Sequence, residues 1–137
     1  MSFQWLQMRI SEEKDRREKE SNILERLPMI MVEVRDALQL CAQQYNEAFG
    51  GDQVEIRLED EMIVVTVRDQ DPPGGVTVTA APALPGIQIA HETYTKEITV
   101  GLLPGEKAFY KDGEDFLTTE ELTRRILDRA FFPKLGE

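Results

Sequence analysis

The chain has 137 residues, 41% of them hydrophobic, and a formal net charge of -10 at pH 7. This length and composition predict one globular domain whose core needs no disulfide support. The single cysteine, Cys41, excludes an intramolecular disulfide and is typical of a reducing compartment.

Several classes of protein are disfavoured by the same features. The chain has no run of ~20 apolar residues that could span a membrane, and its first ten residues lack the pattern of a signal peptide. We therefore expect a cytoplasmic protein. Its acidic surface has no basic stripe, which argues against binding to nucleic acid or to anionic membranes.

The first 22 residues predict a helical extension of unusual character. The segment "SEEKDRREKESN" is polar at every position, and Glu13 stands four residues before Arg17, a spacing that stabilises a helix. As a helix, this spacer is roughly 18 Å long. The segment before it is apolar, and we expect its side chains to form an interaction site made of Phe3, Trp5, Leu6, Met8 and Ile10.

A second helical pattern follows and covers residues 24–49. Its apolar positions recur at steps of three and four and define one helix face: Leu24, Leu27, Met31, Val34, Leu38, Cys41, Tyr45 and Phe49. Pro28 lacks a backbone donor and predicts a kink or the start of a new helix. Gly50 and Gly51 predict the end of the helix.

Residues 54–110 predict an antiparallel meander of five or six strands. The strand-like segments are 54–58, 62–68, 76–80, 87–91 and 97–103, with 108–110 as a short sixth. The links between them are too short for helical crossovers, so consecutive strands should pair antiparallel. Their alternation gives one apolar face, which we expect helices to cover, and one face rich in threonine.

The segment "FYKDGEDFLTTEEL" has the partial spacing of a calcium-binding EF-hand loop, but two positions are wrong. Tyr110 stands where an acidic ligand is needed, and Asp115 stands where a glycine is needed. A better interpretation is a turn at Asp112-Gly113 followed by a capping box, with Thr118 as N-cap and Glu121 three residues later. This predicts a C-terminal helix over about 118–131.

The predicted fold is therefore α+β: a long N-terminal helix, the antiparallel meander, and a C-terminal helix packed on the same face of the sheet. We expect residues 1–22 to form the N-terminal helical extension and residues 23–137 a single α+β domain.

The sequence offers no catalytic, cofactor or metal site. His91 is the only histidine. It follows Ile87 and Ile89 at steps of two, so its side chain is expected on the same face of the sheet. This indicates a structural residue at the edge of the apolar face. Cys41 follows the helix stripe and is expected to be buried. A simple meander would place several acidic residues near one end of the sheet, where solvated loop charges are favoured over a cation site: Asp52, Asp69, Asp71, Glu92, Asp112, Glu114 and Asp115.

These features favour a non-enzymatic protein-interaction module that forms a homodimer through its N-terminal helix. Two alternatives remain open. One is an acidic chaperone or adaptor that binds a partner protein on the threonine-rich face of the sheet. The other is a small-molecule-binding domain with a pocket near His91 and Tyr94.

The segment 110–121 is expected not to bind calcium, because its first and sixth positions cannot serve an EF-hand loop. Isothermal titration should detect no calcium binding tighter than ~1 mM, the weak end of EF-hand affinities. Tighter binding would mean that the loop uses a ligand arrangement other than the one considered.

Overall fold

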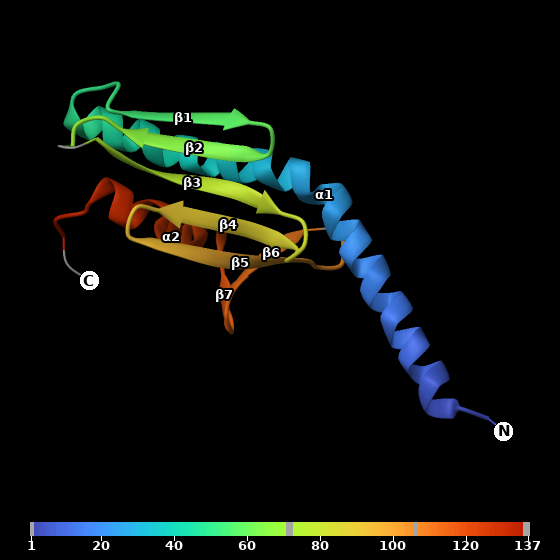
Figure 1. The fold of residues 1–137 in the computed structure, drawn as a ribbon. Helices are drawn as coiled ribbons and strands as arrows, with labels where there is room; N and C mark the ends of the chain where they lie inside the picture. The colour runs from blue at the N-terminus through green and yellow to red at the C-terminus, as the bar shows by residue number, and fades with distance from the viewer. Residues whose placement is uncertain (1, 71–72, 106, 136–137) are drawn as a thin grey trace.

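The computed structural model describes residues 2–70, 73–105 and 107–135, and it confirms the α+β class (Figure 1). A long helix, α1 (Gln4–Phe49), precedes the sheet, and a shorter helix, α2 (Thr119–Phe131), follows it. Between them lie seven strands: β1 (Val54–Glu59), β2 (Met62–Val67), β3 (Gly74–Ala81), β4 (Gly86–His91), β5 (Tyr94–Leu102), β6 (Ala108–Asp112) and β7 (Asp115–Leu117).

The sheet is a simple meander in which each strand pairs antiparallel with the next, in the order β1 to β7. The sheet has seven strands, where five or six were predicted. The additional strand β7 has only three residues, and the sequence pattern indicated a loop there. A tight turn makes β7 possible. Gly113 has φ 61°, the backbone conformation that a two-residue hairpin turn reserves for glycine.

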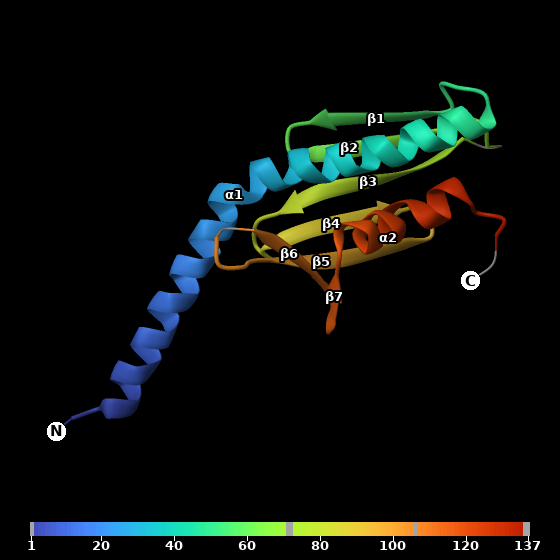
Figure 2. The ribbon, with the colours of Figure 1, turned by 180° about the vertical axis from the view of Figure 1, so that it is seen from behind.

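The helices cover one face of the sheet, as predicted. Figure 1 shows the strands in front of both helices, and Figure 2 shows the helices in front of the strands. The side chains predicted to point inward all belong to the core or pack against it: Val54, Ile56, Leu58, Ile63, Val65, Val67, Val76, Val78, Ile87, Ile89, Ile98, Val100 and Leu102. Six of these side chains, from β2 to β5, are 0% exposed: Ile63, Val67, Val78, Ile87, Ile89 and Ile98.

The buried face of α1 begins at Ile23 and differs in detail from the predicted stripe. Its buried residues are Ile23, Leu27, Ile30, Met31, Val34, Leu38, Ala42 and Tyr45. Leu24 and Phe49, which were predicted to be buried, are exposed, and Cys41 is only partly buried. Five predicted positions keep their place in the buried face: Leu27, Met31, Val34, Leu38 and Tyr45. At the two ends of this face, Ile23 is buried in place of Leu24, and Ala42 is buried more deeply than Cys41.

Pro28 neither ends α1 nor starts a new helix. Pro28 lies inside a single helix of 46 residues, and both views show a bend where α1 reaches the sheet (Figures 1 and 2). A bend is the expected effect of a proline that removes one hydrogen bond of the helix. The boundary predicted between residues 22 and 23 falls inside this continuous helix, immediately before the first buried side chain.

The C-terminal end of α1 is tied to the sheet by side chains. Gly50 ends the helix in the left-handed conformation, with φ 100°. The side-chain oxygen of Asn46 accepts hydrogen bonds from the backbone amides of Gln53 and Val54, each at 2.9 Å. The hydroxyl of Tyr45 donates to the carboxylate of Asp69 at 2.9 Å. These bonds fix the helix to the start of β1 and to the segment after β2.

Both ends of α2 are also held, which fixes the helix against the sheet. The predicted capping box is present: the Thr118 hydroxyl accepts from the Glu121 amide at 3.1 Å, and the Glu121 carboxylate accepts from the Thr118 amide at 3.2 Å. At the other end, the side-chain amide of Gln70 donates to the carbonyl of Ala130 at 2.5 Å.

Replacing Thr118 by alanine is expected to lower the free energy of unfolding by about 1 kcal/mol, because the N-cap bond is lost. Chemical denaturation would measure this difference. Thr119→Ala is the matched control, since it removes the same atoms from the next residue and leaves the cap intact. Equal stability of Thr118→Ala and the unaltered protein would show that the cap contributes nothing.

Candidate functional sites: the projecting arm and two grooves

The first part of α1, residues 3–22, projects away from the sheet and is called the arm here (Figures 1 and 2). Along the described arm no side chain is buried. Ion pairs run along its surface, including Arg9 with Glu12 at 2.8 Å and Glu13 with Arg16 at 2.6 Å and Arg17 at 3.2 Å. Each exposed pair contributes little energy, but together they support a helix that has no core to pack against.

The tip of the arm, residues 3–10, carries all five side chains predicted to form an interaction site. The structure leaves every one of them exposed: Phe3 53%, Trp5 66%, Leu6 39%, Met8 60% and Ile10 40%. Isolated exposed apolar residues are ordinary on protein surfaces, but five of them within eight consecutive residues are typical of a binding segment.

The apolar side chains of the tip lie on two sides of the helix. At about 3.6 residues per turn, Leu6 and Ile10 share one side, while Trp5 and Met8 share the opposite side. A surface helix that packs on one neighbour needs only one apolar side. The tip is therefore suited to a site that contacts it from more than one direction.

A second apolar surface lies between α1 and α2, on the helical side of the domain. It is a groove of ≈ 720 Å³, called the interhelical groove here. One wall belongs to α1 and includes Ala37, Leu40, Cys41 and Ala48, and the other belongs to α2 and includes Leu127. Leu40 at 62%, Phe49 at 55% and Phe132 at 38% exposure stand at its surface.

Sequence reasoning missed this groove because it treated α1 and α2 as separate elements. The sequence did indicate the α1 wall of the groove, because the small residues Ala37, Cys41 and Ala48 recur at helical spacing. The α2 wall depends on where α2 packs beside α1, which no sequence pattern specified.

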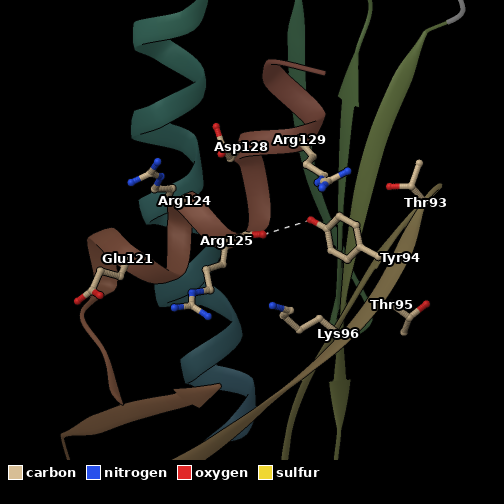
Figure 3. Close-up of a pocket in the computed structure, with 9 residues that line it drawn as sticks. All are labelled: Thr93, Tyr94, Thr95, Lys96, Glu121, Arg124, Arg125, Asp128 and Arg129. Carbon is tan, nitrogen blue, oxygen red and sulfur yellow. Dashed lines mark hydrogen bonds between the residues drawn. The ribbon is translucent and has the colours of Figure 1, made fainter. Parts of the chain in front are cut away.

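A polar groove of ≈ 730 Å³ lies between the start of β5 and α2, and Figure 3 shows the residues that line it. We call it the Tyr94 groove. The Tyr94 hydroxyl donates to the backbone carbonyl of Arg125 at 3.3 Å, and the Arg129 guanidinium lies 5.9 Å from the centre of the Tyr94 ring. Burial raises the pKa of Tyr94 above its usual value, although the charge of Arg129 opposes the increase.

Two of the four cationic side chains that line this groove bind the same carboxylate. Lys96 and Arg125 point into the space between β5 and α2 (Figure 3). Both donate to Asp112, Lys96 at 3.1 Å. Burial raises the pKa of Asp112, but the bonds from Lys96 and Arg125 outweigh it, and the net pKa lies below the usual value. This carboxylate therefore neutralises part of the positive charge of the groove, to which Arg124 and Arg129 also contribute.

Sequence reasoning also missed this ion cluster, although a signal was present. Lys96 has the same parity as Ile98 and Val100 in β5, so it had to lie on the helical side of the sheet. The expected strand began at residue 97, and Lys96 was assigned to the preceding loop.

His91 and Tyr94 are adjacent, as the predicted pocket requires, but their contacts are those of a hairpin turn. They face each other across β4 and β5, with ring centres 5.1 Å apart. The Nδ1 atom of His91 accepts from the Thr93 amide at 3.2 Å. The described lining of the Tyr94 groove holds no cysteine, serine or histidine, so a nucleophile paired with a histidine base is absent from it. A small-molecule site here stays a prediction.

The acidic residues predicted at one end of the sheet do not form a cation site among the described residues. No three histidine, cysteine or acidic side chains in that part of the chain lie close enough together to hold a metal ion. Asp112 instead binds Lys96 and Arg125, and Asp69 accepts from Tyr45. Asp71 lies outside the described residues.

Comparison with known proteins gives no family for this chain: no protein-family model, no curated protein and no solved structure matches it. Among the helices that the structure describes, none is both long enough and apolar enough to cross a membrane.

Replacing Asp112 by asparagine is expected to lower the free energy of unfolding at neutral pH by about 1–2 kcal/mol, because two charged hydrogen bonds are weakened. The folded protein holds the pKa of Asp112 below its usual 3.8. Its contribution is therefore complete well above pH 3.8 and is lost as the pH falls below that value. Denaturation curves at neutral and acidic pH should show a smaller acid-induced loss in Asp112→Asn.

The matched control is Asp115→Asn, which also removes one negative charge. Asp115 is 73% exposed and lies 3.8 Å from Arg125, so we expect a change below ~0.5 kcal/mol. Equal effects of the two substitutions would mean that general surface charge, and not the Asp112 cluster, sets the stability.

Proposed function

We propose that the protein is a non-enzymatic interaction module that associates with a second copy of itself through the tip of its arm. The observation that carries this proposal is the exposure of all five apolar side chains of the tip on a helix held away from its own domain. Burial of one such side chain contributes roughly 1.5–3 kcal/mol. Five together provide a strong driving force for association.

The distribution of charge supports the arm as the contact between copies. Residues 1–22 hold five basic and five acidic side chains and are neutral overall, while residues 23–137 hold 11 basic and 21 acidic side chains. Two such acidic domains repel each other. A neutral arm lets the copies join without placing their acidic surfaces in direct contact, and a two-fold dimer is the commonest form of self-association.

A second candidate function is binding of a partner protein on the side of the sheet opposite the helices. Phe116 is 66% exposed, lies 5.7 Å from Phe109 between ring centres, and has Lys111 over its ring at 5.2 Å. Phe109 also covers Gly101, where a Cβ atom would meet its ring at 2.2 Å. This aromatic group lies beside the threonine-rich surface and favours an adaptor that uses that surface.

Light scattering at micromolar concentrations tests the self-association directly. The full chain is expected to have the mass of a dimer, and the chain without residues 1–20 the mass of a monomer. Trp5→Glu should also shift the mass toward the monomer, because it places a charge among the apolar side chains of the tip.

The matched control is Gln7→Glu, which adds the same charge to an exposed polar position of the same helical turns. It should leave the mass unchanged. A monomer for the unaltered chain, with the same stability after removal of residues 1–20, would overturn the proposal and leave the aromatic surface of the sheet as the remaining candidate.

A further inference from the structure

From the shapes of the two apolar surfaces, we infer that the tip of one copy docks into the interhelical groove of the second copy. The inference rests on the proposed self-association and specifies which surfaces meet. It describes a helix held in a groove with two walls, a common way for proteins to recognise an apolar helix.

The two-sided apolar character of the tip distinguishes this arrangement from pairing of the two arms. Side-by-side arms would cover one side of each tip and leave either the Trp5 and Met8 side or the Leu6 and Ile10 side in water. The groove has an α1 wall and an α2 wall, so it can contact both sides of an inserted helix. The small side chains of Ala37, Cys41 and Ala48 leave room beside the α1 wall.

The groove that receives the tip belongs to another copy, because the arm points away from its own groove. The groove lies beside residues 37–49 of α1, and the tip lies at the opposite end of the same helix (Figure 2). Residues 4–22 extend roughly 28 Å from the first buried turn. Docking within one copy would require α1 to break and reverse direction.

Charge adds to the fit between the two surfaces. Residues 1–11 contain one charged side chain, Arg9. The groove is lined by three carboxylates, those of Glu120, Glu121 and Asp128, and by one guanidinium, that of Arg124. A groove with this excess of carboxylates favours the tip, which contains no acidic side chain, over the spacer residues, which contain five.

Cross-linking between a cysteine in the tip and Cys41 in the groove tests this arrangement. Cys41 is the only cysteine of the chain, so Met8→Cys supplies the second reactive group without other changes. An equal mixture of isotope-labelled and unlabelled Met8→Cys would be treated with a short bismaleimide and digested. Mass spectrometry should then find peptides that join residue 8 of one copy to Cys41 of the other.

The control Met8→Cys with Cys41→Ser should lose this linkage, which confirms the position of the cross-link. A dimer whose linked peptides join residue 8 to residue 8 would overturn docking in the groove and leave self-association standing. A monomer in light scattering would overturn both. Linkage of residue 8 to Cys41 within single copies would also overturn both, because the arm would then fold back.

A substitution in the groove gives an independent measurement. Leu40 is 62% exposed in the single copy, so Leu40→Glu should fold normally and raise the dissociation constant of the dimer by at least about tenfold. Gln39→Glu adds the same charge at a neighbouring exposed position outside the groove and should leave the constant unchanged. A dimer insensitive to Leu40→Glu would overturn docking in the groove.

Discussion

A continuous helix that is longer than the sheet it covers determines the shape of this protein. The 46 residues of α1 extend ~69 Å, whereas the nine residues of β5, the longest strand, extend ~30 Å. The apolar face of the sheet can therefore bury only the later part of the helix, from Ile23 onward. Since α1 continues through Pro28, the earlier part extends into solvent as the arm.

The other contacts of the domain depend on how the later part of α1 is held. Asn46 and Tyr45 tie its end to β1 and to the segment after β2. Gln70, in that same segment, holds the end of α2. The two helices thus lie side by side on one face of the sheet, and the space between them becomes the interhelical groove. The arm and the groove are two consequences of the same packing.

This arrangement separates two properties of the surface. The domain from residue 23 onward carries all of the net negative charge, while the arm is neutral and ends in exposed apolar side chains. Long-range repulsion keeps such domains apart, and contact must come from the neutral apolar part. The proposal that the tip enters the groove of a second copy satisfies both requirements, because the tip covers apolar surface on the partner.

The sequence predicted the parts of the fold that depend on local pattern. The side chains that alternation assigned to the inner face between Val54 and Leu102 all belong to the core or pack against it, and the spacing of Thr118 and Glu121 identified the capping box. Sequence patterns did not predict the features that are set by tertiary packing. Ile23 is buried where Leu24 was expected, and Ala42 is buried more deeply than Cys41, because packing against the sheet decides between adjacent positions at the edges of the helix face. The strand β7 has only three residues and is too short to carry an alternation.

The candidate sites divide in the same way. Composition alone identified the five apolar residues of the tip, because they precede a spacer that is polar throughout. The interhelical groove and the cluster of Asp112 with Lys96 and Arg125 were not identified, since each joins residues from separate elements. Such sites depend on the position of α2, which follows from the complete core and not from any one segment.

The fluorescence of Trp5 tests the central claim most directly, because it is the only tryptophan in the chain and lies in the tip. Its emission would be recorded during serial dilution of the unaltered protein. The account predicts the blue-shifted emission of a buried indole at high concentration, and a shift toward the emission of a solvated indole as the dimer dissociates. Solvated emission at every concentration would contradict it, because Trp5 would then never leave water.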